Sequence, residues 1–118
     1  MKRGPENPEL KKVIHALEKA AVAHDAPVYE RLAHLFRRPT RQRSEVNLNK
    51  VARLSNDGKT LATYKVLSLG KATKNINVAA FAYSKAAKAK IAHAGGHAIS
   101  IPELLKTKPD GKDVQLLL

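Results

Sequence analysis

The uneven distribution of charge is the sequence feature that most restricts how this chain can fold. The 118 residues contain 22 Lys and Arg against 10 Asp and Glu, a net charge of +12 at neutral pH. Residues 37–102 hold thirteen of the basic residues and only two acidic ones, Glu45 and Asp57, a surplus of +11. Self-repulsion on this scale destabilises a compact chain, and a polyanion would relieve it. The middle of the chain is therefore predicted to fold against a polyanionic partner.

The remaining composition indicates a single small domain and excludes several classes of site. Hydrophobic residues make up 43% of the chain and aromatic residues 4%, so the core must consist mainly of Ala, Val, Leu and Ile. Cysteine is absent, which excludes disulfides, thiolate metal sites and a Cys nucleophile. No apolar stretch approaches the roughly 20 residues of a membrane span, and no secretory h-region follows the Met-Lys-Arg start. We expect a cytoplasmic protein. An anionic membrane surface remains a second candidate polyanion.

Residues 1–38 are predicted to form an N-terminal helical hairpin. In the first helix, the spacing i, i+3, i+4, i+7 places one apolar face on Leu10, Val13, Ile14, Leu17 and Ala21. Asp25 is predicted to cap a second helix that has Pro27 in its first turn. The apolar stripe of that helix is Val28, Leu32, Leu35 and Phe36. Pro39 ends the helix, since the residue before a proline is pushed out of the α region.

Residues 39–45 are predicted to be a basic loop, and residues 46–118 an α/β core. The core begins with a short helix over 46–54, with Val51 and Leu54 facing inward, and a turn at 55–58 follows. Strands are predicted at 60–64, 76–81, 97–99 and 114–118. Ser84 caps a helix that runs to about Ala94, and Ser100 caps another that runs to about Lys106. The predicted fold class is α/β: one domain, in which a helical hairpin precedes a compact core of short strands and helices.

Two groups of basic residues are the candidate nucleic-acid contacts. The loop carries arginines, whose planar forks match phosphate geometry, together with hydrogen-bonding side chains between them. Lys71, Lys74, Lys85, Lys88 and Lys90 form a second basic set without a neutralising acid, although lysines on a helix are often only a solvated face. The predicted RNA-binding residues are Lys2, Arg3, Arg37, Arg38, Thr40, Arg41, Gln42, Arg43, Lys50, Arg53, Lys65, Lys71, Lys74, Lys85 and Lys88.

No motif in the chain predicts catalysis. Gly70-Lys71 lacks the second glycine and the Ser or Thr after Lys that a nucleotide-hydrolase phosphate loop requires. His93 and His97 are separated by Gly95-Gly96, which breaks the helix that would bring their imidazoles together on one metal ion. The carboxylates do not combine into an acid–base pair. We therefore expect no enzymatic activity, metal, cofactor or small-molecule substrate.

Seven segments, in order, resemble a known ribosomal protein family. They are Asn7-Pro8-Glu9-Leu10, Val46-Asn47-Leu48-Asn49-Lys50-Val51, Lys65-Val66-Leu67-Ser68-Leu69-Gly70, residues 78–84, residues 87–96 (AKAKIAHAGG), residues 100–105 and residues 109–114. The set resembles the archaeal and eukaryotic large-ribosomal-subunit protein eighteen family, in its short archaeal form. That family shares a core domain with bacterial large-subunit protein fifteen. Thr63-Tyr64-Lys65 departs from the family pattern, in which a Pro-Gly turn would precede Lys-Val-Leu.

The resemblance implies a non-catalytic structural constituent of the large ribosomal subunit. Its core would consist of irregular β-β-α turns with N-terminal helices. Its partners would be large-subunit (23S-type) rRNA and neighbouring large-subunit ribosomal proteins, with no role at a membrane. Two alternatives use the same charges: a nucleoid-type protein that binds DNA without sequence preference, and an enzyme acting on RNA. Co-sedimentation with large ribosomal subunits would support the ribosomal function, whereas equal affinity for any duplex would support the nucleoid-type protein. Turnover of an RNA substrate by the pure protein would support the enzyme.

Overall fold

Five helices and five strands follow one another in the residues that the computed structural model describes, which are 8–38, 45–55, 59–73 and 75–117. The helices are α1 (Pro8–Ala23), α2 (Pro27–Phe36), α3 (Leu48–Leu54), α4 (Lys85–His93) and α5 (Ile101–Thr107). The strands are β1 (Glu45–Asn47), β2 (Thr60–Leu67), β3 (Asn77–Tyr83), β4 (His97–Ser100) and β5 (Val114–Leu116). The predicted class, a helical hairpin followed by an α/β core, is confirmed.

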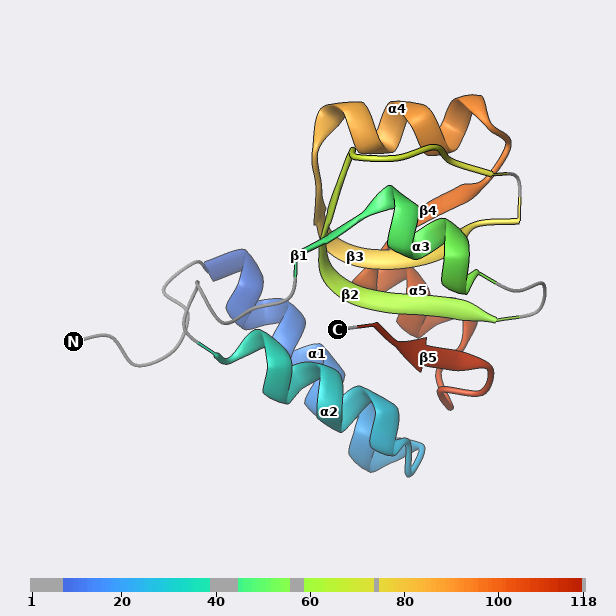
Figure 1. The fold of residues 1–118 in the computed structure, drawn as a ribbon. Coiled ribbons are helices and arrows are strands. Elements are labelled where there is room, and N and C mark those ends of the chain that lie inside the picture. The colour runs from blue at the N-terminus through green and yellow to red at the C-terminus, as the bar shows by residue number, and fades with distance from the viewer. Residues whose placement is uncertain (1–7, 39–44, 56–58, 74, 118) are drawn as a thin grey trace.

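All pairings in the sheet are parallel, which the sequence patterns did not reveal. β3 lies between β2 and β4, and the other edge of β2 is shared by two short strands. β5 pairs with Thr60–Ala62, and β1 pairs with Lys65–Leu67. Because parallel strands need long crossovers, the chain must pass over the faces of the sheet between strands. Both faces are consequently covered by helices (Figure 1).

Two separate hydrophobic cores form on the two faces. On one face, α1, α2 and α5 pack against Ala62 and Ala79. On the other face, α3 and α4 pack against Leu61 and Val78. Burial on both faces explains why the centre of the sheet shows consecutive apolar or small residues instead of a clean alternation. The sheet therefore separates the α1–α2 hairpin from the α3–α4 side.

The N-terminal hairpin forms as predicted, except at its turn. Leu10, Val13, Ile14 and Leu17 of α1 are all buried, and Pro27 occupies the first turn of α2. The prediction that Asp25 caps α2 is wrong: the capping position is Ala26, with no side-chain hydrogen bond. Asp25 has a φ of 49°, in the left-handed region, whereas a capping side chain needs an extended backbone. Asp25 instead reverses the chain between the helices.

Three aromatic rings join the hairpin to the sheet. Phe36, in the last turn of α2, lies edge-on to Tyr64 of β2 and Phe81 of β3, with ring centroids 5.4 and 6.3 Å away. Tyr64 and Phe81 stack on each other at 5.6 Å. Such pairs add to the free energy gained from area burial alone. The cluster holds three of the five aromatic residues in the chain, so most of the aromatic content lies where the hairpin meets the sheet.

The predicted helix over 46–54 is partly wrong. Residues 45–47 form β1, and the helix begins at Leu48. Val51 is buried as predicted, but Leu54 is 38% exposed and does not face inward. Starting the helix two residues later turns Leu48 and Val51 toward the core and leaves Leu54 at the helix end.

The helix caps in the core are confirmed. Ser84 accepts a hydrogen bond from the Ala87 amide at 3.2 Å, and Ser100 accepts one from the Glu103 amide at 3.3 Å. The segment 63–65, which departs from the family pattern, contains no turn: β2 runs through it from Thr60 to Leu67. β2 is therefore longer than the predicted strand at 60–64.

Tyr29 ties α2 to the C-terminal part of the chain and makes stability sensitive to alkaline pH. Its hydroxyl donates to the Lys108 carbonyl, and its side chain is fully buried. Burial, with a smaller contribution from the charge of Asp110, raises the pKa of Tyr29 from 10.0 to about 12. Because the native state holds this proton more tightly, the stabilisation is complete below about pH 10 and is lost as the pH rises toward 12.

We therefore expect Tyr29→Phe to cost about 1 kcal/mol of unfolding free energy at neutral pH, through the lost hydrogen bond. This difference from the wild type should shrink by roughly 1 kcal/mol between about pH 9 and pH 11. Urea unfolding followed by circular dichroism at a series of pH values measures both effects. A difference that stays constant with pH would show that Tyr29 does not titrate with a raised pKa.

Candidate nucleic-acid interface

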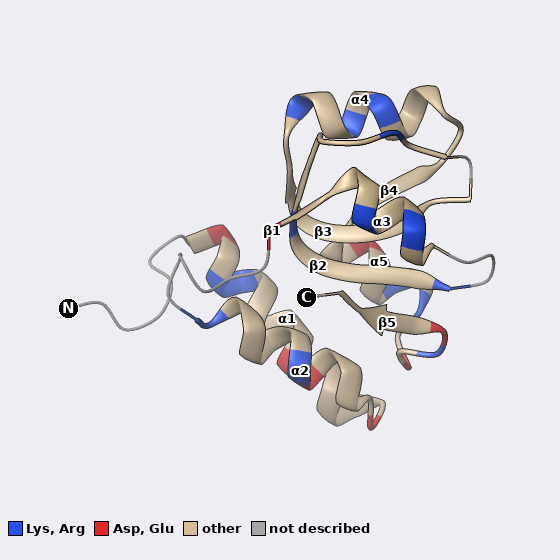
Figure 2. Cartoon of the chain, in the orientation of Figure 1, with Lys and Arg blue, Asp and Glu red and all other residues tan. Residues whose placement is uncertain are grey.

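The α3–α4 side of the sheet carries cations without acids. No Asp or Glu occurs among the described residues between Val46 and Pro102; Asp57 lies outside them. Figure 2 shows Lys and Arg on α3, on α4 and on the connection that runs beside α4, whereas the described acids lie elsewhere. The basic face is defined here as Lys50, Arg53, Lys71, Lys85 and Lys88.

The fold fixes where these cations sit. Lys50 and Arg53 lie on α3, whose Leu48 and Val51 are buried against the sheet. Lys85 and Lys88 lie on α4, which is held by buried Ala87 and Ile91 and by the Ser84 cap. Lys71 follows β2 in the connection to β3. Four of the five side chains are exposed and Lys50 is half-buried. These predicted contacts from two sequence regions therefore share one side of the molecule.

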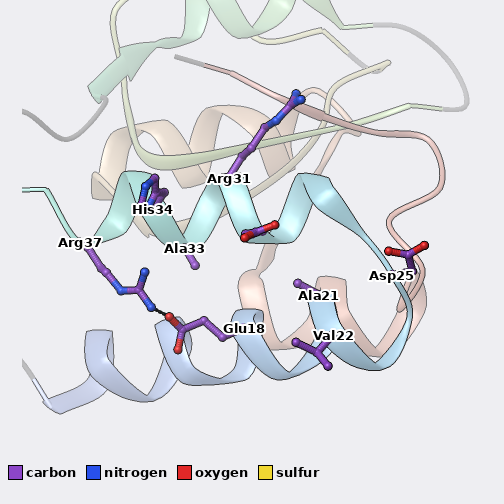
Figure 3. A pocket seen from close by; sticks show the side chains of 9 residues that line it. Glu18, Ala21, Val22, Asp25, Arg31, Ala33, His34 and Arg37 are labelled. Atoms are coloured by element: carbon purple, nitrogen blue, oxygen red, sulfur yellow. Dashed lines mark ion pairs between the residues drawn. The ribbon is translucent and has the colours of Figure 1, made fainter.

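Arg37 and Arg38 lie apart from the basic face, at the end of α2. Both are exposed. Arg37 forms an ion pair with Glu18 of α1, and Figure 3 shows its side chain turned toward that carboxylate. A phosphate would have to compete with Glu18 for this guanidinium. Arg37 was predicted from the sequence as an RNA contact, and its pairing with Glu18 was missed because Glu18 is 19 positions away.

The other predicted contacts divide into one placed residue and several outside the described part of the chain. Lys65 is half-buried in β2, where it pairs with β1 on one side and β3 on the other. The predicted residues that lie outside the described ranges are Lys2, Arg3, Thr40, Arg41, Gln42, Arg43 and Lys74. Most of the predicted basic loop is therefore not placed, and its role stays a prediction.

The 68–70 segment, which follows β2, is bonded to both helices of the basic side. The Leu69 amide donates to Asn47 Oδ1 at 3.3 Å, and the Leu69 carbonyl accepts from the Asn49 amide at 3.0 Å. Lys90 Nζ of α4 donates to the Ser68 and Gly70 carbonyls at 2.8 and 3.1 Å. Sequence reasoning did not identify these contacts, which join residues 20 to 22 positions apart.

Gly70 allows the 68–70 segment to pack closely against the start of α3. Its φ is +114°, and a Cβ atom there would lie 2.5 Å from the Asn49 backbone nitrogen. Only glycine combines that backbone conformation with so close an approach. Gly70 therefore has a packing role.

The described residues offer little to other chemistries. They contain no group of three or more His, Cys, Asp or Glu side chains placed to hold a metal ion. In the same ranges no helix is both long and apolar enough to cross a membrane. A groove of about 620 Å³ runs between α1 and α2, but its lining mixes acids such as Glu18 and Glu30 with Arg31 and Arg37 (Figure 3). The basic face is the more distinctive surface.

Comparison with known proteins identifies the family. A model of ribosomal proteins, whose description names 50S-L15 and 50S-L18e together with a 60S counterpart, matches residues 29–99. That range includes most of α2 and the whole of α3, the 68–70 segment and α4. The chain belongs to this ribosomal protein family. The resemblance seen in the ordered sequence segments is thereby confirmed.

Archaeal relatives match the chain over nearly its whole length. Large ribosomal subunit protein eL18 of Methanopyrus kandleri is 40% identical to this chain in an alignment of 120 positions. The alignment covers 97% of this chain and 94% of the relative. The eL18 protein of Methanococcus maripaludis is 34% identical, over 99% of this chain and 96% of the relative. That of Archaeoglobus fulgidus is 35% identical, over 95% and 97%. The family's members are thus similar to this chain on both sides of the sheet.

Proposed function

We propose that this protein is a structural constituent of the large ribosomal subunit that binds and stabilises large-subunit rRNA. The observation that carries the proposal is the acid-free basic face on a member of this ribosomal protein family. The names of the relatives place them in the large subunit. Neighbouring large-subunit proteins are further proposed partners, and the proposal includes no catalytic step.

The proposed mechanism is electrostatic and depends on fixed positions. Lys and Arg that neutralise phosphates release condensed counterions, which drives association at moderate salt. Helical RNA offers a protein mainly its backbone, its 2′-hydroxyls and its shape. A rigid face whose cations stand on α3 and α4 can match one arrangement of phosphates better than others. The proposed RNA contacts on this face are Lys50, Arg53, Lys71, Lys85 and Lys88; Lys65, Arg37, Arg38 and the basic loop are proposed as additional contacts.

Selectivity for RNA distinguishes this function from DNA binding without preference. We expect the purified protein to bind at least one fragment in a tiled set of large-subunit rRNA transcripts about tenfold or more tighter than a DNA duplex of equal length, at equal salt. Filter binding or fluorescence anisotropy measures the ratio. An epitope-tagged copy should also co-sediment with large subunits in the source cells. Equal affinity for any duplex would instead favour the nucleoid-type alternative.

A further inference from the structure

The 68–70 segment differs from an ordinary surface loop because the protein already satisfies its backbone. Both polar backbone groups of Leu69 are bonded to the start of α3, through Asn47 and Asn49. The carbonyls on either side, those of Ser68 and Gly70, are bonded to Lys90. The segment therefore enters any complex with its conformation already set.

Asn47 and Lys90 both use their side chains in an unusual way. Asn47 stands at the capping position of α3 but makes no capping hydrogen bond; its Oδ1 accepts from the Leu69 amide instead. Lys90 is an exposed lysine of α4, yet its ammonium donates to two backbone carbonyls of another segment. An ammonium has three donors, so two of them are committed within the protein. Lys90 is less available to a phosphate than Lys85 or Lys88.

The side chain at the centre of this hydrogen-bonded segment, that of Leu69, is apolar. Leu69 is 64% exposed, and the next cation, Lys71, follows it by two positions. A single exposed leucine is common on protein surfaces. Here, however, its backbone is fixed and it lies among cations without any acid nearby in the sequence. An apolar tip between phosphate-binding cations fits riboses or unstacked bases, which RNA exposes between its phosphates.

We propose that the 68–70 segment is a prefolded RNA-contact element in which Leu69 packs on ribose or base, and that Lys90 is the residue that positions it. This inference rests on the proposed rRNA binding and assigns that binding a specific contact. It also separates the lysines of α4 into two roles: Lys85 and Lys88 neutralise phosphates, whereas Lys90 holds the neighbouring segment in place.

The test compares two lysines on the same helix. Lys90→Met and Lys88→Met remove the same charge, but the described structure gives only Lys90 a hydrogen bond to the 68–70 segment. Each variant is measured with the tightest-binding rRNA transcript over a range of salt concentrations. Lys88→Met should reduce the slope of log K against log salt by about 0.7 to 0.9, as one lost phosphate contact does. Lys90→Met should leave that slope unchanged and lower affinity about fivefold, through lost pre-organisation.

Three further variants provide independent readouts. Asn47→Ala removes the bond to the Leu69 amide without changing charge, so it should lower affinity as Lys90→Met does. Hydrogen exchange of the free protein should speed up at Leu69 in both Asn47→Ala and Lys90→Met, but not in Lys88→Met. Leu69→Ala should weaken RNA binding severalfold with the slope unchanged, and Lys90→Arg, which keeps donors at this position, should retain most of the affinity.

The possible failures are distinguishable. If Lys90→Met reduces the salt slope as Lys88→Met does and leaves exchange at Leu69 unchanged, then Lys90 is a phosphate contact and the positioning role is wrong. If Leu69→Ala binds every transcript as the wild type does, the segment is not an RNA contact, and a protein neighbour would be its partner. If the wild type itself binds no transcript, the proposed function fails together with the RNA role of the segment. The hydrogen-exchange data still show whether Asn47 and Lys90 hold the 68–70 segment in place.

Discussion

Phe36→Ala is expected to lower the free energy of unfolding by about 3 to 5 kcal/mol. The Phe36 side chain is fully buried at the end of α2 and contacts both Tyr64 and Phe81. Its removal leaves a cavity between the hairpin and the sheet and breaks the aromatic cluster that joins them. A domain of this size has a total stability of about 5 to 15 kcal/mol, so this single change removes a large fraction of it.

Urea unfolding followed by circular dichroism measures this loss, because the chain has no tryptophan to serve as a fluorescent probe. Val22→Ala is the matched control: it also truncates an apolar side chain of the hairpin, but Val22 is 86% exposed. The control should stay within about 0.5 kcal/mol of the wild type. If the unfolding free energy of Phe36→Ala lies within about 1 kcal/mol of that of Val22→Ala, the hairpin is not held through this cluster. That threshold is about a third of the expected cavity cost.

The hairpin was predictable because its signals are local. The spacing of Leu10, Val13, Ile14 and Leu17 repeats with the period of a helix, and a helix needs only neighbouring residues to form its hydrogen bonds. The caps at Ser84 and Ser100 are local for the same reason. The prediction that Asp25 caps α2 was wrong because an aspartate two positions before a proline fits both a cap and a left-handed turn. Only the packing of the two helices decides between them.

The sheet was less predictable because its order depends on distant pairings. β1 is three residues long and exists through its pairing with Lys65–Leu67, about twenty positions away. No pattern within Glu45–Asn47 signals a strand, so the sequence favoured a longer helix there. The parallel direction of every pairing likewise has no local signature. The sequence patterns could identify most strands individually, but not their neighbours.

The candidate site shows the same division between local and distant information. Charge is a property of the residues themselves, so the basic stretch could be located from sequence. The partner of each cation, however, cannot be read from the sequence. Arg37 is paired with Glu18, and Lys90 is bonded to Ser68 and Gly70. Lys90 and Lys88 look equivalent in the sequence, as neighbouring lysines on one short helix. Their difference arises only when β2 and α4 are brought together.

Neutralising the four helical cations of the basic face, with Lys71 kept, should nearly abolish the proposed rRNA binding without unfolding the protein. The variant changes Lys50, Arg53, Lys85 and Lys88 to Gln. Each lost phosphate contact removes about 0.7 to 0.9 from the salt slope and, near physiological salt, about fivefold in affinity. Four contacts together predict a slope lower by about 3 and an affinity lower by roughly a hundredfold to a thousandfold. Lys50 is half-buried, so thermal unfolding of the variant is measured alongside binding.

The control must remove the same charge from the opposite side of the sheet. Lys11, Lys12, Lys19 and Arg31 lie exposed on α1 and α2, and changing them to Gln lowers the net charge by the same four units. If the protein bound RNA only through its overall charge, both variants would lose affinity equally. We expect the control to lose less than about tenfold, because charges on that side act on the RNA only through screened, longer-range attraction. Equal losses would show that net charge, and not the basic face on α3 and α4, determines binding.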